Sequence, residues 1–125
     1  MKTLRPYQKT IADNGAVILD KFGMLYLSME VRTGKSATSM EIASILDFKE
    51  VLFLTKKKAI DGILEDYNDF GYEFNITVIN DESMHKILNP SRFDLVIHDE
   101  NHRFGSFLVH LVVLSYSRSY SQTSR

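Results

Sequence analysis

The chain has 125 residues, of which 44% are hydrophobic and 25% charged, and its formal net charge is −1. This length is enough for one domain with one core, and the composition is that of an ordinary globular protein. The charge gives no overall basic footprint for nucleic acid, and the absence of cysteine excludes a disulfide scaffold and cysteine-bound zinc. The polar amino-terminal stretch and the shortness of the apolar runs predict a soluble, cytoplasmic protein without a signal peptide or membrane span.

Short apolar runs alternate with helical patterns along the first hundred residues, and Gly23 and Gly71 interrupt two of the helical patterns. The predicted elements are a helix within 4–21, a strand at 24–29, a helix at 37–46, a strand at 51–54, a helix at 58–70, a strand at 74–79, a helix at 81–88 and a strand at 94–98. This alternation predicts an α/β fold with a parallel sheet that helices cover on both faces. In such sheets, ligands bind at the carboxyl ends of the strands.

The segment 30–36, Glu-Val-Arg-Thr-Gly-Lys-Ser, joins a predicted strand to a predicted helix. Backbone N–H groups at such a turn and the helix dipole favour a bound anion. Lys35 would reach the β- and γ-phosphates of a nucleotide, the Ser36 hydroxyl would bind Mg²⁺, and Gly34 would let the backbone approach a phosphate. Met29 replaces the first glycine of the general phosphate-loop consensus. Taken alone, Gly-Lys-Ser is equally compatible with an ordinary turn that carries a solvated lysine.

A second motif consists of two adjacent carboxylates, Asp99 and Glu100, after the apolar run 95–97. A carboxylate at a strand end can hold Mg²⁺, and a second one can orient or deprotonate an attacking water, so we assign Asp99 to the metal and Glu100 to the water. The alternative interpretation of this motif alone is a strand end with solvated acids. The two motifs in this order predict a P-loop fold that binds ATP and Mg²⁺.

Four segments together resemble the first RecA-like domain of superfamily 2 DNA helicases and translocases of the phage or remodeller type. Asp-Glu-Asn-His at 99–102 resembles their D-E-x-H box, and Leu-Arg-Pro-Tyr-Gln at 4–8 resembles the segment that reads the adenine edge. The loop 30–36 is similar to the E-M-x-T-G-K-[ST] version of the phosphate loop, and 51–57 resembles motif Ia, which touches the nucleic-acid backbone. The resemblance spans about residues 4 to 105 and implies a three-layer RecA-like P-loop NTPase domain with a mainly parallel sheet.

The resemblance also implies a role for individual residues. The adenine would lie near Arg5 and Gln8, the phosphates near Thr33, Gly34, Lys35 and Ser36, the backbone of DNA or RNA near Thr55 and Lys56, and His102 would couple the nucleotide state to the nucleic-acid site. The alternative interpretations are a surface helix residue for Gln8, a solvated charge run for 56–58, and local hydrogen bonding for His102.

The composition changes at residue 107, after which the chain contains no Asp, Glu or Lys. We expect residues 1–106 to form the ATP-binding domain, incomplete at its C-terminus, and 107–125 to form an atypical tail that arises from a truncation or frameshift. The apolar part of this tail would add an edge strand, and its Ser-rich end would be disordered. The second RecA-like domain, which supplies an arginine finger in the family, is missing, so we expect this chain alone to hydrolyse ATP poorly and to unwind nothing.

The sequence leaves two other functions open. The first is a P-loop ATPase outside the helicases, such as an AAA-type machine, although the segment around Gln8 and the position of His102 count against it. The second is a non-catalytic remnant or interaction module that binds nucleotide, DNA or a partner without turnover.

Overall fold

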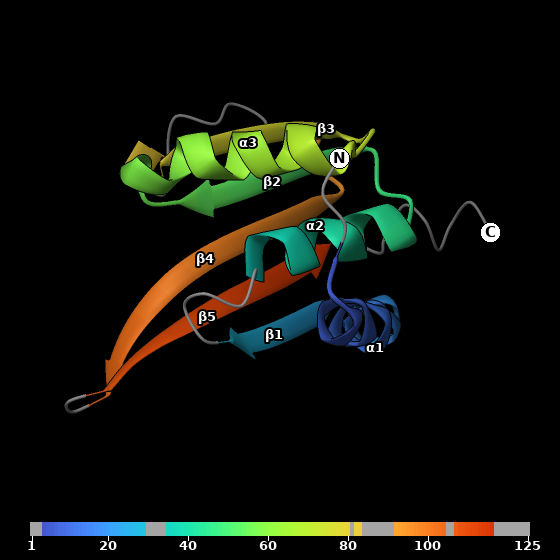
Figure 1. The fold of residues 1–125 in the computed structure, drawn as a ribbon, viewed down its shortest axis with the longest axis horizontal. Helices are drawn as coiled ribbons and strands as arrows, with labels where there is room; N and C mark the ends of the chain where they lie inside the picture. Colours follow the sequence, from blue (N-terminus) through green and yellow to red (C-terminus); the bar gives the residue numbers. More distant parts are fainter. Residues whose placement is uncertain (1–3, 30–34, 81, 84–91, 105–106, 117–125) are drawn as a thin grey trace.

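The computed structural model describes residues 4–29, 35–80, 82–83, 92–104 and 107–116, and of residues 28, 29, 35, 100–104 and 107–116 it describes the backbone alone. Within these ranges the chain forms one five-stranded sheet with three α-helices (Figure 1). The elements in chain order are α1 (Pro6–Phe22), β1 (Met24–Met29), α2 (Lys35–Ile45), β2 (Glu50–Thr55), the 3₁₀-helix η1 (Lys57–Ala59), α3 (Ile60–Phe70), β3 (Asn75–Asn80), β4 (Leu95–Phe104) and β5 (Phe107–Tyr116).

The alternation of helices and strands predicted up to residue 80 is confirmed. Gly23 ends α1 and Gly71 ends α3, both in the left-handed conformation, with φ of 77° and 72°. The Gly23 N–H donates to the Leu19 carbonyl oxygen at 2.7 Å, which satisfies one of the last carbonyls of the helix. The helix predicted at 81–88 falls largely outside the described residues.

The strand order is β1-β5-β4-β2-β3. Strands β3, β2 and β4 pair in parallel, whereas β5 pairs antiparallel with both β4 and β1. Because β5 runs against both neighbours, β1 and β4 point in the same direction. The segment after residue 106 therefore adds an interior strand, and our expectation of an edge strand was wrong.

Strand β4 is longer than its apolar pattern indicates. Only Leu95 to His98 pair with β2, but pairing with β5 continues to Phe104. The acidic motif at 99–102 consequently lies inside a strand, and not after one as we expected. The reason is that an antiparallel partner supplies hydrogen bonds along the whole of β4, including its polar half.

The three helices pack on one face of the sheet, with α2 between α1 and α3 (Figure 1). Alternate strand residues face them in the main core, among them Leu27, Phe53 and Ile97. On the opposite face, Leu52 and Leu54 pack with Phe93. Within the described residues, the fold is therefore α/β with helices on one face of the sheet. Helices on the second face, which a three-layer fold requires, stay a prediction.

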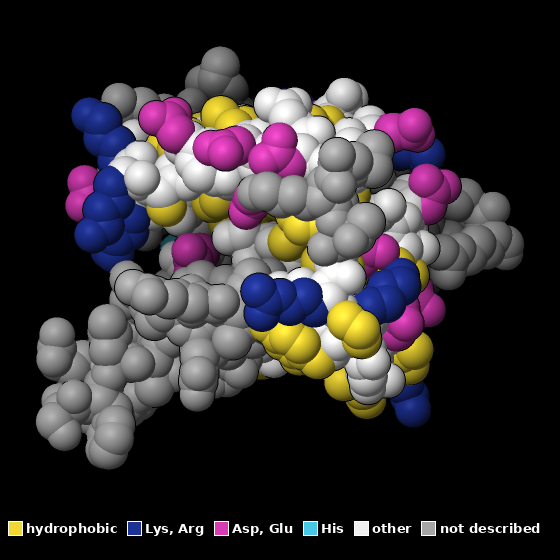
Figure 2. Space-filling model, in the orientation of Figure 1, with side chains coloured by type: hydrophobic (Ala, Val, Ile, Leu, Met, Phe, Trp, Pro, Cys, Tyr) yellow, Lys and Arg dark blue, Asp and Glu magenta, His cyan; other side chains and the backbone are white. Residues whose placement is uncertain are grey.

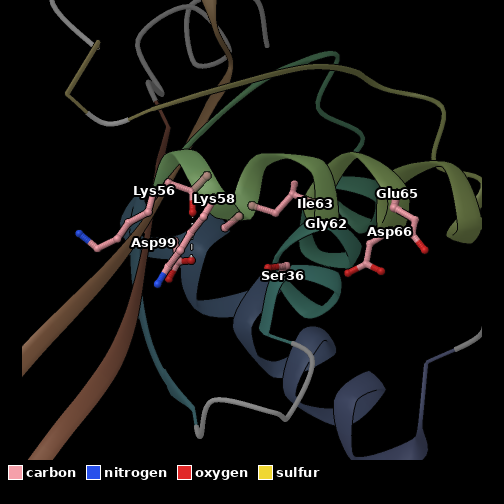
Figure 3. A pocket seen from close by; sticks show the side chains of 10 residues that line it. Ser36, Lys56, Lys58, Gly62, Ile63, Glu65, Asp66 and Asp99 are labelled. Atoms are coloured by element: carbon pink, nitrogen blue, oxygen red, sulfur yellow. Dashed lines mark hydrogen bonds between the residues drawn. The ribbon is translucent and has the colours of Figure 1, made fainter.

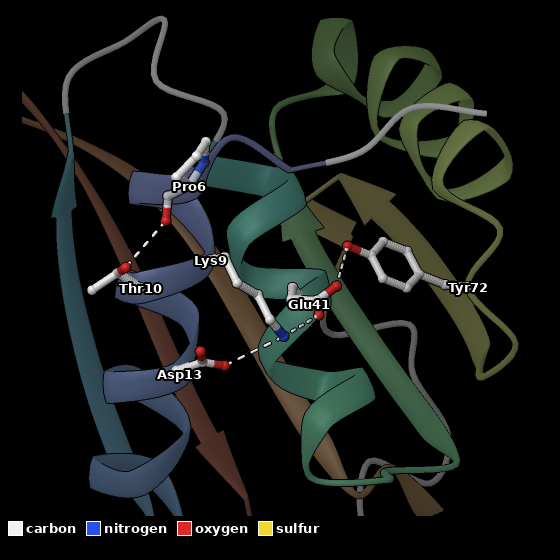
Figure 4. A network of polar contacts seen from close by, with 6 residues as sticks. All are labelled: Pro6, Lys9, Thr10, Asp13, Glu41 and Tyr72. Carbon is white, nitrogen blue, oxygen red and sulfur yellow. Dashed lines mark hydrogen bonds and ion pairs between the residues drawn. The ribbon is translucent and has the colours of Figure 1, made fainter.

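A polar network ties the helices together at their exposed side (Figure 4). Lys9 Nζ on α1 lies 3.3 Å from Asp13 Oδ1 and 3.0 Å from Glu41 Oε2 on α2. Tyr72 lies in the segment after α3. Its hydroxyl is 3.1 Å from Glu41 Oε1 and 3.2 Å from the Ala37 carbonyl oxygen. Glu41 therefore links α1 to the segment between α3 and β3.

This network predicts a pH dependence of stability. Burial, followed by the charge of Glu41, raises the pKa of Tyr72. Because an unfolded tyrosine has a pKa near ~10, the neutral hydroxyl stabilises the fold fully below about pH 10, and this stability is lost as the pH rises further. We expect the free energy of unfolding of the wild type to fall more steeply above about pH 10 than that of Tyr72→Phe, as measured by chemical denaturation. Parallel curves for wild type and Tyr72→Phe would contradict the prediction.

Candidate functional site

A cavity of about 430 Å³ lies on the helix-bearing face of the sheet, at the end of β2 and beside β4 (Figure 3). Its lining comes from the start of α2, the end of β2, η1, α3 and the middle of β4. The lining residues are Ser36, Thr55, Lys56, Lys58, Ala59, Gly62, Ile63, Glu65, Asp66 and Asp99. The cavity thus brings together side chains from three of the segments that the sequence singled out: Ser36, the pair Thr55 and Lys56, and Asp99.

The parallel pairing of β2 and β4 places Asp99 in this cavity. Asp99 follows Ile97 by two positions and therefore shares its face, which is the face that the helices cover. The Thr55 hydroxyl donates to Asp99 Oδ2 at 3.3 Å. His98 lies on the other face, as the strand alternation predicts.

The first motif reaches the cavity through the start of α2. Lys35 is the first residue of this helix, and Ser36 lines the cavity. A helix start carries unpaired backbone N–H groups and the positive end of the helix dipole, both of which favour an anion. Thr33 and Gly34 lie outside the described residues, and the side chain of Lys35 does as well.

Lysines lie on one side of the cavity and acids on another. The side chains of Lys56, Lys57 and Lys58 are exposed. Lys and Arg atoms gather near η1, next to the start of α3, while acidic atoms lie over α3 (Figure 2). Lys58 extends toward Asp99, whereas Lys56 extends away from it (Figure 3). From the sequence we expected Lys56 to contact nucleic acid and expected no role for Lys58. A run of three lysines carries no signal for which of them turns inward, because the 3₁₀ turn decides it.

The other predicted residues lie away from this cavity or have undescribed side chains. Gln8 is buried at the start of α1, where its Oε1 accepts a hydrogen bond from the Arg5 backbone N–H at 2.9 Å. This bond satisfies one of the free N–H groups at the helix start. Neither Gln8 nor Arg5 lines the cavity, so their proposed contact with adenine stays a prediction. Glu100 and His102 lie in β4, where the backbone alone is described.

The described part of the chain contains no group of three or more His, Cys, Asp or Glu side chains that could hold a metal ion by itself. Among the described helices, none is long and apolar enough to cross a membrane.

The fold and the cavity define an α/β protein with a polar site where the parallel pairing of β2 and β4 ends. No family model matches the chain, and comparisons with curated proteins and with solved structures also give no match.

Proposed function

We propose that this chain is the ATP-binding domain of a superfamily 2 DNA helicase or translocase, with a RecA-like fold, and that it binds ATP·Mg²⁺ in the cavity beside Asp99. The observation that carries the proposal is that Ser36 and Asp99, which belong to motifs far apart in the sequence, line one cavity. The volume of about 430 Å³ falls within the ~300–1,000 Å³ of small-molecule sites.

The side chains in this cavity fit a magnesium ion bound together with a nucleotide. Mg²⁺ prefers oxygen ligands and usually takes one or two carboxylates, with phosphate oxygens and waters in the other positions. The Ser36 hydroxyl and the Asp99 carboxylate are such oxygens, and they line the cavity from α2 and β4. When bound, Mg²⁺ would neutralise charge on the β- and γ-phosphates.

The remaining roles follow from the resemblance and from the charges around the cavity. Lys35, at the start of α2, would contact the β- and γ-phosphates, and Glu100 would orient the attacking water. Lys56, beside the cavity, would contact the backbone of DNA or RNA. The acids over α3 would repel a phosphate backbone, so we place the nucleic-acid path at η1 and not across α3.

Titration calorimetry of the purified chain with ATP tests this proposal. We expect saturable binding that is tighter with Mg²⁺ than with EDTA, because Ser36 and Asp99 add metal contacts to those of the phosphates. We also expect ATP to bind more tightly than AMP, which lacks the β- and γ-phosphates. A folded protein that binds no ATP under either condition would refute the proposal and favour an interaction module without nucleotide.

A further inference from the structure

Thr55 is a buried polar side chain at the end of β2. Its side chain is 1% exposed, and the four preceding residues of β2 are buried and apolar. Burying a hydroxyl costs free energy unless the hydroxyl forms a hydrogen bond. Here the hydroxyl donates to Asp99 Oδ2 at 3.3 Å. The side chain of Thr55 therefore turns toward the carboxylate in the cavity and away from solvent.

The alignment of β2 with β4 holds Thr55 next to Asp99. At the amino ends, Asp94 Oδ2 accepts hydrogen bonds from the backbone N–H groups of Lys49 at 2.9 Å and Glu50 at 3.1 Å. Further along, Leu54 pairs with His98. The residue after Leu54 in β2 is Thr55, and the residue after His98 in β4 is Asp99. Both side chains lie on the face that the helices cover. A slip of one residue would turn Asp99 to the opposite face, so the register holds the two side chains together.

We infer that Thr55 is a positioning residue, which holds the carboxylate of Asp99 in the orientation that binds Mg²⁺. This inference rests on the proposed function of the cavity. A hydrogen bond to one carboxylate oxygen restricts rotation of the carboxylate and so orients it before the metal arrives. Partners of this kind behind a metal ligand typically contribute ~10- to 100-fold to metal affinity. The role differs from the contact with nucleic-acid phosphates that the sequence suggested for Thr55, because an almost fully buried hydroxyl offers little surface to a phosphate backbone.

The test compares the affinity for ATP in Mg²⁺ with that in EDTA for the wild type, Thr55→Val and Thr55→Ser. Valine keeps the shape of threonine without the hydroxyl, whereas serine keeps the hydroxyl without the methyl group. We expect Thr55→Val to lower the gain in affinity from Mg²⁺ about tenfold or more and to leave the affinity in EDTA unchanged. Thr55→Ser should retain most of the gain. A purely structural role would instead lower both affinities together.

The outcomes separate this inference from the proposed function. If the wild type binds ATP and Thr55→Val gains as much from Mg²⁺ as the wild type, the positioning role is refuted and the cavity assignment stands. Equal losses in Thr55→Val and Thr55→Ser would also refute it, because the loss would then be the same whether the hydroxyl is kept or removed. If the wild type binds no ATP, the proposed function and this role fail together. Should Thr55→Val not fold, Thr55→Ala and Thr55→Ser give the same comparison, since they differ in the hydroxyl oxygen.

Discussion

Lys35→Ala is expected to weaken the binding of ATP·Mg²⁺ by about 10- to 150-fold, which corresponds to the loss of a hydrogen bond to a charged group, ~1.5–3 kcal/mol. Lys35 is the first residue of α2, next to Ser36 on the wall of the cavity. An ammonium group at this position would contact the β- and γ-phosphates, where the negative charge of the nucleotide is concentrated. Titration calorimetry with ATP in the presence of Mg²⁺ measures the change directly.

Lys57→Ala is a matched control for this experiment. It removes the same charge from a lysine of η1 that does not line the cavity. We expect Lys57→Ala to bind ATP within about twofold of the wild type, because an exposed charge outside the site is screened by water and salt. Equal affinity of Lys35→Ala and wild type would show that the segment 30–36 is an ordinary turn. Equal losses in both variants would point to a general effect of net charge.

Phe53→Ala is expected to lower the free energy of unfolding by about 3–5 kcal/mol. The side chain is fully buried in β2, where it pairs with Val78 of β3 and Ile97 of β4 and faces the helices. Its removal leaves a cavity against an interior strand of the sheet that neighbouring strands cannot close without losing their pairing. Because domains of this size have a total stability of ~5–15 kcal/mol, the loss is a large part of the whole. Urea denaturation followed by circular dichroism measures it.

The matched control is Phe22→Ala, at a phenylalanine that is 68% exposed at the end of α1. Exposed substitutions of this kind usually change stability by less than ~0.5 kcal/mol. A cost for Phe53→Ala that is no larger than that for Phe22→Ala would mean that β2 is not buried in the core as described. That result would also remove the basis for the pairing of Thr55 with Asp99.

Much of the candidate site could be predicted because its parts are encoded locally. The apolar run 24–29 predicts a strand and the apolar positions of 37–46 predict a helix, so the place of the segment 30–36 between a strand and a helix follows from sequence. Asp99 continues an apolar strand, and alternation along that strand gives its face. The roles of two residues of the site could not be predicted from sequence. Lys58 belongs to a run of lysines with no distinguishing pattern, and the burial of Thr55 depends on a strand partner that the sequence does not identify.

The sequence by itself determined the order of the helices and strands up to residue 80, the glycines that end α1 and α3, and the motifs that contribute Ser36 and Asp99. Only the tertiary structure decided that β5 lies between β1 and β4, that β4 extends through the acidic motif, and that Thr55 bonds to Asp99. The physical reason is the range of the interactions. Helices and turns depend on neighbours a few residues away, whereas strand order and register depend on hydrogen bonds and side-chain packing between segments far apart in the chain.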